Sequence, residues 1–459
     1  MAEHRKFHFS TLEQLRDEIA RLGVDINLSD DLTVLARPVA VGNLYAPNAF
    51  AVLPMEGCDC LQDGSPSELT RRRYLRLFGG GAGLIWWEAC AVVPEGRANP
   101  RQMMLTEGNL RSFTELVRGT KREAALQNSP GHRPVSILQL THSGRYSRPN
   151  SHRPEPIIPQ NDPILDPLSG VTENTPLATD EYLASLPEKY ARSAVLAREA
   201  GFDGVDIKSC HRYLFSELLA SHTREGIYGG SFENRTRLLL DTVRAVREAV
   251  GDDFIIACRF NVFDAHPYPY GFGSAKDDPW SFDPGEPMEL VQLLRMENVQ
   301  LLSNSAGNPY YIYPQVTRPF DTSSLGIPVP REDPLESVAR LFAFTAAVQQ
   351  AAPDIPVAGN GYSWLRQFLP YAGAANLKNG KCSFVGLGRS SFAYPQAPRD
   401  ILSGRGMKEG NCCVTCSKCT QIMRDHGKTG CVVRDSEVYA PLYRCARESA
   451  EARERSAEL

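Results

Sequence analysis

AGFDGVDIKSCHRYL, residues 200–214, is the stretch of sequence that decides the fold. At its centre, 204–208 is a short β-rich run, and a helical pattern over 180–200 precedes it. A second helical pattern, 234–250, leads into another β-rich run at 254–260. Strand, helix and strand in this order predict parallel strands joined by helical crossovers. The polar side chains that follow the first run are therefore expected at the carboxyl edge of the sheet.

The same alternation extends in both directions along the chain. Further helical patterns cover 285–297 and 334–351. The candidate strands are 50–55, 83–89, 135–140, 204–208, 254–260, 301–306, 356–360 and 383–388. Eight strands that alternate with helices predict an α/β fold of the TIM type, a (β/α)8 barrel. A doubly wound open sheet is the alternative, although no GxGxxG follows an early strand to support its dinucleotide-binding form.

Three regions are expected along the 459 residues. Residues 1–37 form an N-terminal extension with an amphipathic helix over 11–23. Residues 38–403 form the barrel, and its long polar stretches at 146–178 and 261–284 are expected as loops on the active-site face. From 404 to 459 the alternation stops, and a short C-terminal Cys-rich segment leads into a charged, helix-prone tail at 445–459.

Composition limits the partners and the location. The chain is 42% hydrophobic and 23% charged, with a net charge of −4, so it offers no electrostatic reason to bind nucleic acid or an anionic membrane. No apolar run reaches the length of a membrane span, and the polar N-terminus lacks a signal-peptide pattern. A cytoplasmic protein is expected. Six of the twelve cysteines fall between Cys412 and Cys445, and such clustering in a reducing compartment favours metal over disulfides.

The cysteine spacing is the most specific local signal. Cys413, Cys416 and Cys419 stand three residues apart, and Cys431 follows after eleven more. A CxxCxxC triplet with one distant cysteine favours a [4Fe–4S] cluster, because zinc sites usually pair two CxxC units. Zinc remains the alternative, and Cys412 could replace Cys413 as a ligand.

Several strand ends resemble the Old Yellow Enzyme family of FMN-dependent ene-reductases. The likeness is greatest to its iron–sulfur branch, which includes 2,4-dienoyl-CoA reductase, 2-enoate reductase and trimethylamine dehydrogenase. The quoted stretch is the strongest match, together with YGGSFENRTR at 228–237. The remaining matches are VGNLYAPNAFAVLPM (41–55), GGGAGLIWWEA (79–89), QLTHSGR (139–145), SAGNPYY (305–311), AGNG (358–361) and VGLGR (385–389). They keep the family's order over about 38–435.

This resemblance implies an FMN site, assigned to Pro54, Met55, Glu56, Ala89, Gln139, Arg259, Gly359, Asn360, Gly361, Gly388 and Arg389. Barrels commonly bind phosphate after strands seven and eight, where Arg389 would add a guanidinium. Gln139 can pair with the flavin pyrimidine, and Arg259 would stabilise the charge of reduced flavin. A surface role for Arg389 and a structural ion pair for Arg259 are the alternatives, and Met55 and Ala89 could simply be core.

The resemblance places substrate chemistry on Lys208, His211 and Tyr213. Lys208 and His211 would grip the substrate carbonyl, and Tyr213 would donate a proton. Lys208 departs from the family, which usually has histidine there, and a lysine favours a carboxylate or a developing enolate. Glu56 departs as well, since the family commonly has Thr or Cys; pairing of Lys208 with Glu56 is the alternative role. Tyr310 and Tyr311 are candidate pocket residues, or else core.

The iron–sulfur relatives continue into domains that bind FAD and a nicotinamide, whereas this chain ends 28 residues after Cys431. No such domain is expected, so electrons should come from a ferredoxin, a flavoprotein or NAD(P)H. The expected reaction is reduction of the activated C=C bond of a small unsaturated substrate by hydride from flavin N5. The alternatives are an amine or C–H dehydrogenase that passes electrons outward, and a non-catalytic electron-transfer or zinc-stapled subunit. Homo-oligomer formation stays open.

Overall fold

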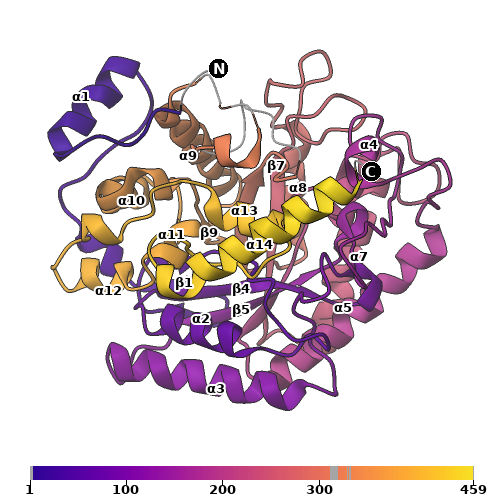
Figure 1. Ribbon diagram of the computed structural model, residues 1–459, viewed down its shortest axis with the longest axis horizontal. Coiled ribbons are helices and arrows are strands. Elements are labelled where there is room, and N and C mark those ends of the chain that lie inside the picture. Colours follow the sequence, from indigo (N-terminus) through magenta and orange to yellow (C-terminus); the bar gives the residue numbers. More distant parts are fainter. Residues whose placement is uncertain (1–3, 311–318, 328, 330–331, 458–459) are drawn as a thin grey trace.

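Eight parallel strands form a closed barrel that helices surround (Figure 1). The structure, a computed structural model, describes residues 4–310, 319–327, 329 and 332–457. Neighbouring strands follow the order β10-β3-β4-β5-β6-β7-β8-β9, and a bridge between Ala358 and Phe384 joins the two ends. The strands are β3 (Phe50–Val52), β4 (Leu84–Ala91), β5 (Val135–Thr141), β6 (Gly204–Ile207), β7 (Ile255–Phe263), β8 (Leu301–Ala306), β9 (Val357–Ala358) and β10 (Val385–Leu387). The predicted (β/α)8 fold is confirmed.

Helices connect successive strands and cover the outside of the barrel. They are α2 (Glu68–Phe78), α3 (Leu110–Gln127), α4 (Asp166–Ser169), α5 (Asp180–Ala200), α6 (Leu214–Leu219), α7 (Phe232–Val250), α8 (Gly285–Met296), α9 (Pro334–Ala351), α10 (Leu369–Lys378), α11 (Arg389–Ala393) and α12 (Ala397–Leu402). Single 3-10 segments are η1 (Thr33–Ala36), η2 (Pro94–Gly96), η3 (Gly144–Tyr146), η4 (Ser323–Leu325), η5 (Tyr362–Phe368) and η6 (Glu409–Asn411). The predicted helix α5 has its predicted bounds because Thr179 caps its first turn and Gly201, at φ 93°, ends it.

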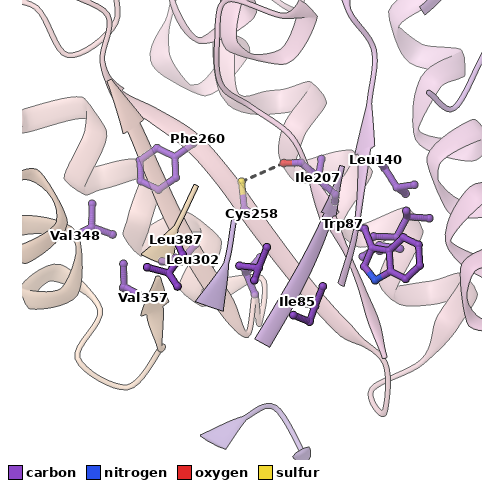
Figure 2. Close-up of a cluster of buried hydrophobic side chains, with 14 of the residues drawn as sticks. Ile85, Trp87, Leu140, Ile207, Cys258, Phe260, Leu302, Val348, Val357 and Leu387 are labelled. Atoms are coloured by element: carbon purple, nitrogen blue, oxygen red, sulfur yellow. Dashed lines mark hydrogen bonds between the residues drawn. The ribbon is translucent and has the colours of Figure 1, made fainter. Parts of the chain in front are cut away.

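The strands carry two apolar layers, because successive side chains point to opposite faces. Trp86 and Ile137 point inward and pack with Ile255 and Leu301 inside the barrel. Trp87 points outward, toward the helices, as part of the larger cluster that Figure 2 shows. Both layers are buried, so the strands are apolar on both faces, as parallel barrels require.

A hairpin that was not predicted from the sequence, β1 (Val39–Val41) and β2 (Leu44–Ala46), covers the amino end of the barrel. Val41 and Ala46 belong to the inner apolar cluster. Gly42, at φ 57°, turns the chain between the two strands. The dipeptide Gly42-Asn43 was a usable signal for this turn.

The Cys-rich segment and the last helices lie against the carboxyl end of the barrel. They are α13 (Lys418–Arg424) and α14 (Ser436–Ala457), the long yellow helix of Figure 1. Arg424 donates to the Pro309 carbonyl at 2.8 Å, and the Thr429 amide donates to the Gly57 carbonyl at 2.7 Å. The tail is helical as predicted, although the helix begins well before residue 445. The predicted N-terminal helix is α1 (Leu12–Leu22). No helix of the described residues is long and apolar enough to cross a membrane.

Closure of the barrel depends on Gly386. A Cβ on this residue would lie 1.9 Å from the Gly359 carbonyl oxygen, which belongs to the neighbouring strand end. Gly386→Ala should therefore destabilise the protein by about 2–3 kcal/mol. Gly119→Ala is the control, because its Cβ would meet nothing within 4 Å in helix α3; it should be stabilising by about 0.5–1 kcal/mol. Urea unfolding measures both, and equal stability of the two variants would contradict the account.

Candidate active site

A cavity of about 220 Å³ opens at the carboxyl end of the barrel. Its wall contains most of the residues singled out in the sequence: Pro54, Met55, Glu56, Gln139, Lys208, His211, Tyr213, Arg259, Tyr310, Asn360, Gly361, Gly388 and Arg389. Ala89 lies behind the wall, paired in register with Gln139. Gly359 also lies outside it, and its amide donates to the Phe384 carbonyl. Tyr311 lies outside the described residues.

A tight turn after β6 presents three side chains to this cavity. His211 and Arg212 both have positive φ, at 67° and 58°, a conformation that costs a non-glycine residue free energy and persists only where its surroundings fix it. Two contacts fix it here. The Asn261 side chain accepts from the His211 amide at 3.1 Å, and the buried Arg212 guanidinium pairs with Asp264 at 2.9 Å. Lys208, His211 and Tyr213 consequently face the same cavity.

Lys208 and Glu56 form an ion pair inside the cavity. The Lys208 Nζ lies 3.2 Å from the Glu56 Oε1, and the two side chains are 2% and 16% exposed. The same Nζ lies 3.8 Å from the centre of the Tyr213 ring, a cation–π contact. The pairing of Lys208 with Glu56, which the sequence offered as an alternative role, is therefore present. Since Lys208 is buried and Glu56 is largely so, removal of either partner would leave the other uncompensated.

Tyr213 belongs to a chain of phenols. Its Oη lies 2.7 Å from that of Tyr310 and 3.4 Å from the Glu56 carboxylate. Tyr146 stacks on Tyr310 with ring centres 4.0 Å apart, and its Oη accepts from Asn308. Burial raises the pKa of both Tyr213 and Tyr310 far above 10. Both hydroxyls therefore carry their protons at neutral pH and can donate them.

His211 is a neutral group in this cavity. Its Nε2 lies 3.1 Å from the Ser305 Oγ. Burial, with the nearby cations Arg259, Lys208 and Arg389, lowers the pKa of His211 well below its usual range. The neutral imidazole can donate only one hydrogen bond. Ser305 was quoted in the family match but given no role; it lies near the end of β8, two strands along the barrel from β6.

A buried carboxylate controls the orientation of Gln139. The Asp206 Oδ2 accepts from the Gln139 Nε2 at 2.6 Å and from the Trp86 indole at 2.9 Å. Its Oδ1 accepts from the Arg259 amide at 2.8 Å. Because the Gln139 amide nitrogen faces Asp206, its oxygen is left for the cavity. Sequence reasoning gave Asp206 no role, since a single acid in a strand does not reveal its partners on other strands.

Unpaired buried donors lie on β7 and directly after β10. The Arg389 Nη1 and the Ser390 Oγ are buried and have no hydrogen-bond partner among the described residues, and neither has the Arg259 Nε. Arg389 lies 4.5 Å from the Phe320 ring centre and forms no ion pair in the described part of the chain. Buried donors without partners are costly, so this wall fits an anionic group with several acceptor atoms, as the phosphate of FMN would supply.

The four predicted cysteine ligands line a second cavity. Cys413, Cys416, Cys419 and Cys431 face it together. The Thr415 amide donates to the Cys413 sulfur at 3.4 Å, and the Arg434 amide donates to the Cys431 sulfur at 3.3 Å. Amide donors to sulfur fit thiolates that hold a metal cluster. Among the described residues, no group of three His, Cys, Asp or Glu side chains is arranged to hold a single metal ion.

Cys412 lies apart from this cavity. It is 1% exposed and packs in the large apolar cluster. Its thiol donates to the Lys408 carbonyl at 3.5 Å. The geometry thus favours Cys413 over Cys412 as the ligand.

The profile of the NADH:flavin oxidoreductase / NADH oxidase family matches residues 34–269, slightly more than half of the chain. The chain belongs to this family. An NADH oxidase of Thermoanaerobacter brockii is 27% identical over 382 residues, which are 82% of this chain and 52% of the relative. A cinnamate reductase of Clostridium sporogenes is 26% identical over 428 residues, 88% of this chain and 58% of the relative. The chain therefore spans about half the length of these relatives.

Solved structures agree with this family assignment at the level of the fold. A complex of 2-naphthoyl-CoA reductase aligns with a TM-score of 0.67 and 20% identity over 88% of this chain and 57% of that one. An old yellow enzyme homologue of Zymomonas mobilis aligns with a TM-score of 0.60 and 18% identity over 82% of this chain and 94% of that one. The chain thus has the barrel fold of these structures.

Asp206 should make stability depend on pH. Burial raises its pKa to about 7, against about 3.9 for an exposed aspartate. Between these values the folded protein keeps a proton that the unfolded chain releases, so the stability due to Asp206 falls as the pH rises. The free energy of unfolding of the wild type, minus that of Asp206→Asn, should drop by about 4 kcal/mol from pH 4 to pH 8. Urea titrations measure it; a difference that does not change with pH would contradict the assignment.

Proposed function

We propose that the barrel cavity binds FMN and that the enzyme reduces the activated C=C bond of an enoate, enone or enoyl thioester. One observation carries the proposal: a neutral, proton-bearing Tyr213 faces the same cavity as the unpaired buried donors of Arg389 and Arg259. A flavin site and a proton donor thus share one space. The relative named cinnamate reductase supports an enoate-like substrate.

The residues present fit the flavin. Gln139, held by Asp206, would accept from the pyrimidine edge, and Arg259 would place a positive charge beside it. Arg389 would hold the phosphate together with the backbone at Gly388 and Asn360. When bound, FMN supplies the hydride that attacks the β carbon of the substrate.

The protein's own groups orient and protonate the substrate. Lys208 has three N–H donors; Glu56 takes one, and the remainder can polarise a substrate carbonyl together with His211. Tyr213 Oη would give its proton to the α carbon. Tyr310, whose Oη lies 2.7 Å from that hydroxyl, would return a proton to it, and the Glu56 carboxylate would accept a hydrogen bond from it. Lys208 therefore acts as half of an ion pair, and its charge is already balanced by Glu56. In this state it suits a neutral carbonyl better than it would suit a second anion.

Tyr213→Phe should separate the two half-reactions. Protonation of substrate should slow by about 10²–10⁴-fold, while flavin reduction stays unchanged because Tyr213 gives no proton to that step. Stopped-flow absorbance of the flavin measures each half-reaction. Tyr190→Phe is the matched control, since the Tyr190 hydroxyl is buried without a hydrogen-bond partner in the described structure and lies outside the cavity. Equal losses in both half-reactions of Tyr213→Phe would refute its role.

The cysteine cavity is proposed to hold a [4Fe–4S] cluster through which electrons enter from a ferredoxin or flavoprotein. The CxxCxxC spacing and the shared cavity support a cluster over zinc. Arg389, Phe320 and Cys419 line both cavities, so the two cofactors would be neighbours. NAD(P)H as a direct reductant of the flavin is the alternative electron source.

Metal analysis tests the cluster. Anaerobically purified protein should contain about four iron and four sulfide per chain, and Cys416→Ser should lose them. Cys445→Ser is the control, because Cys445 is exposed and lies outside the cavity; it should keep its iron. Flavin content shows that both variants are folded. One zinc and no iron in the wild type would overturn the cluster, and rapid flavin reduction by NADH in the cluster-free variant would overturn its role as electron entry.

A further inference from the structure

Five basic side chains gather beside the active-site cavity. The rings of His152 and His426 stack with centres 4.2 Å apart and planes inclined by 24°. Arg101, Arg148 and Arg453 all act electrostatically on both rings. These five side chains, here called the basic cluster, come from the loops after β4 and β5, the segment after α13, and helix α14. Four distant parts of the sequence thus bring their basic residues to one place.

The fold does not neutralise this cluster. None of its three arginines forms an ion pair in the part of the chain that the structure describes, and the Arg148 Nε is buried there without a hydrogen-bond partner. The neighbouring carboxylate, Asp425, pairs instead with Arg447 at 3.1 Å. Burial and the arginines lower the pKa of both histidines, so the rings are neutral near pH 7 and the arginines remain charged. Three unopposed positive charges fit an anionic ligand.

Backbone carbonyls take some of the arginine donors. Arg101 donates to the Cys58 carbonyl at 3.0 Å and to the His426 carbonyl at 2.6 Å, and Arg453 donates to the Asp425 carbonyl at 3.0 Å. A neutral donor could form the same hydrogen bonds to these carbonyls, so the bonds do not explain why the side chains are positively charged. Among the described residues, no backbone carbonyl accepts from the Arg148 side chain, which makes it the clearest candidate to meet a ligand.

The cluster stands at the rim of the cavity. Tyr146, two residues before Arg148, stacks on the cavity residue Tyr310. His426 lies between Met423 and Thr429, which both line the cavity wall. A ligand that occupies the cavity can therefore extend over this rim. A free enone or enoate is too small to need such a second site, whereas a substrate or reductant with a nucleotide tail would use it.

We propose that the basic cluster is a phosphate subsite, which holds the nucleotide end of a ligand whose reactive end enters the flavin cavity. The inference rests on the proposed function of that cavity. Arginine guanidinium groups bind phosphate with paired, charge-assisted hydrogen bonds. Two ligands share this chemistry: a coenzyme A thioester as substrate, and NADPH as reductant. The experiment has one arm for each.

Binding is measured first, by calorimetry on the holoenzyme, with coenzyme A and NADP⁺ as non-reacting probes. Arg148→Gln and Arg453→Gln should each lower the affinity for the true ligand at least about tenfold. The affinity of the wild type should fall with added salt. Arg111→Gln is the matched control, because Arg111 is 92% exposed on helix α3 and pairs with Glu115. It should bind both probes as the wild type does.

Turnover gives the second arm. With cinnamoyl-CoA, kcat/KM should fall at least about tenfold in Arg148→Gln, while the N-acetylcysteamine thioester of cinnamate, which lacks the nucleotide, should be unaffected. If NADPH is the ligand, the loss appears instead in the KM for NADPH. The proposal is overturned if neither probe binds more weakly in the variants, or if both thioesters lose activity equally when dithionite replaces NADPH as the reductant. Absence of any ene-reduction would contradict the proposed function alone, since the binding arm still decides the subsite.

Discussion

The buried guanidinium of Arg212 holds the active site together. It pairs with Asp264 at 2.9 Å and Asp162 at 3.3 Å, which come from the long loops after β7 and β5. His266 joins the same two loops through Asp162 at 2.8 Å. These contacts fix the left-handed turn that presents Lys208, His211 and Tyr213, and a buried acid would be left uncompensated without them. The two long loops that were expected on the active-site face therefore support this turn.

Two departures from the family pattern explain each other. Lys208 and Glu56 are 152 residues apart in sequence, yet they form one ion pair in the cavity. A lysine alone would put an unpaired charge into a space already occupied by Arg259, and a glutamate alone would oppose the charge of reduced flavin. Together they add no net charge to the cavity, and they place a carboxylate within hydrogen-bonding reach of the Tyr213 hydroxyl. The pair thus stands where carbonyl recognition and substrate protonation are proposed to meet.

Much of this could be predicted from sequence, because periodicity and strand ends are local signals. Helices α5 and α9 have their predicted bounds, and most predicted site residues share one cavity. Strand bounds were predicted less well: β3, β6, β9 and β10 are shorter than expected, and β4, β5 and β7 are longer. β9 is only Val357–Ala358, and Gly361, at φ 96°, turns the chain soon after it. Ser305, Asp206 and Tyr146 were missed as site residues, since their partners lie on other strands or loops and leave no pattern along the chain.

The central claim is that one cavity combines a bound flavin with a substrate proton donor for C=C reduction. A single-turnover measurement tests it most directly: anaerobic holoenzyme, reduced by dithionite, is mixed with one equivalent of an enoate or enoyl thioester. The account predicts that the flavin reoxidises as one equivalent of saturated product forms, with one solvent proton at the α carbon. A flavin that stays reduced with every unsaturated carbonyl compound, but is bleached from the oxidised state by an amine, would contradict it.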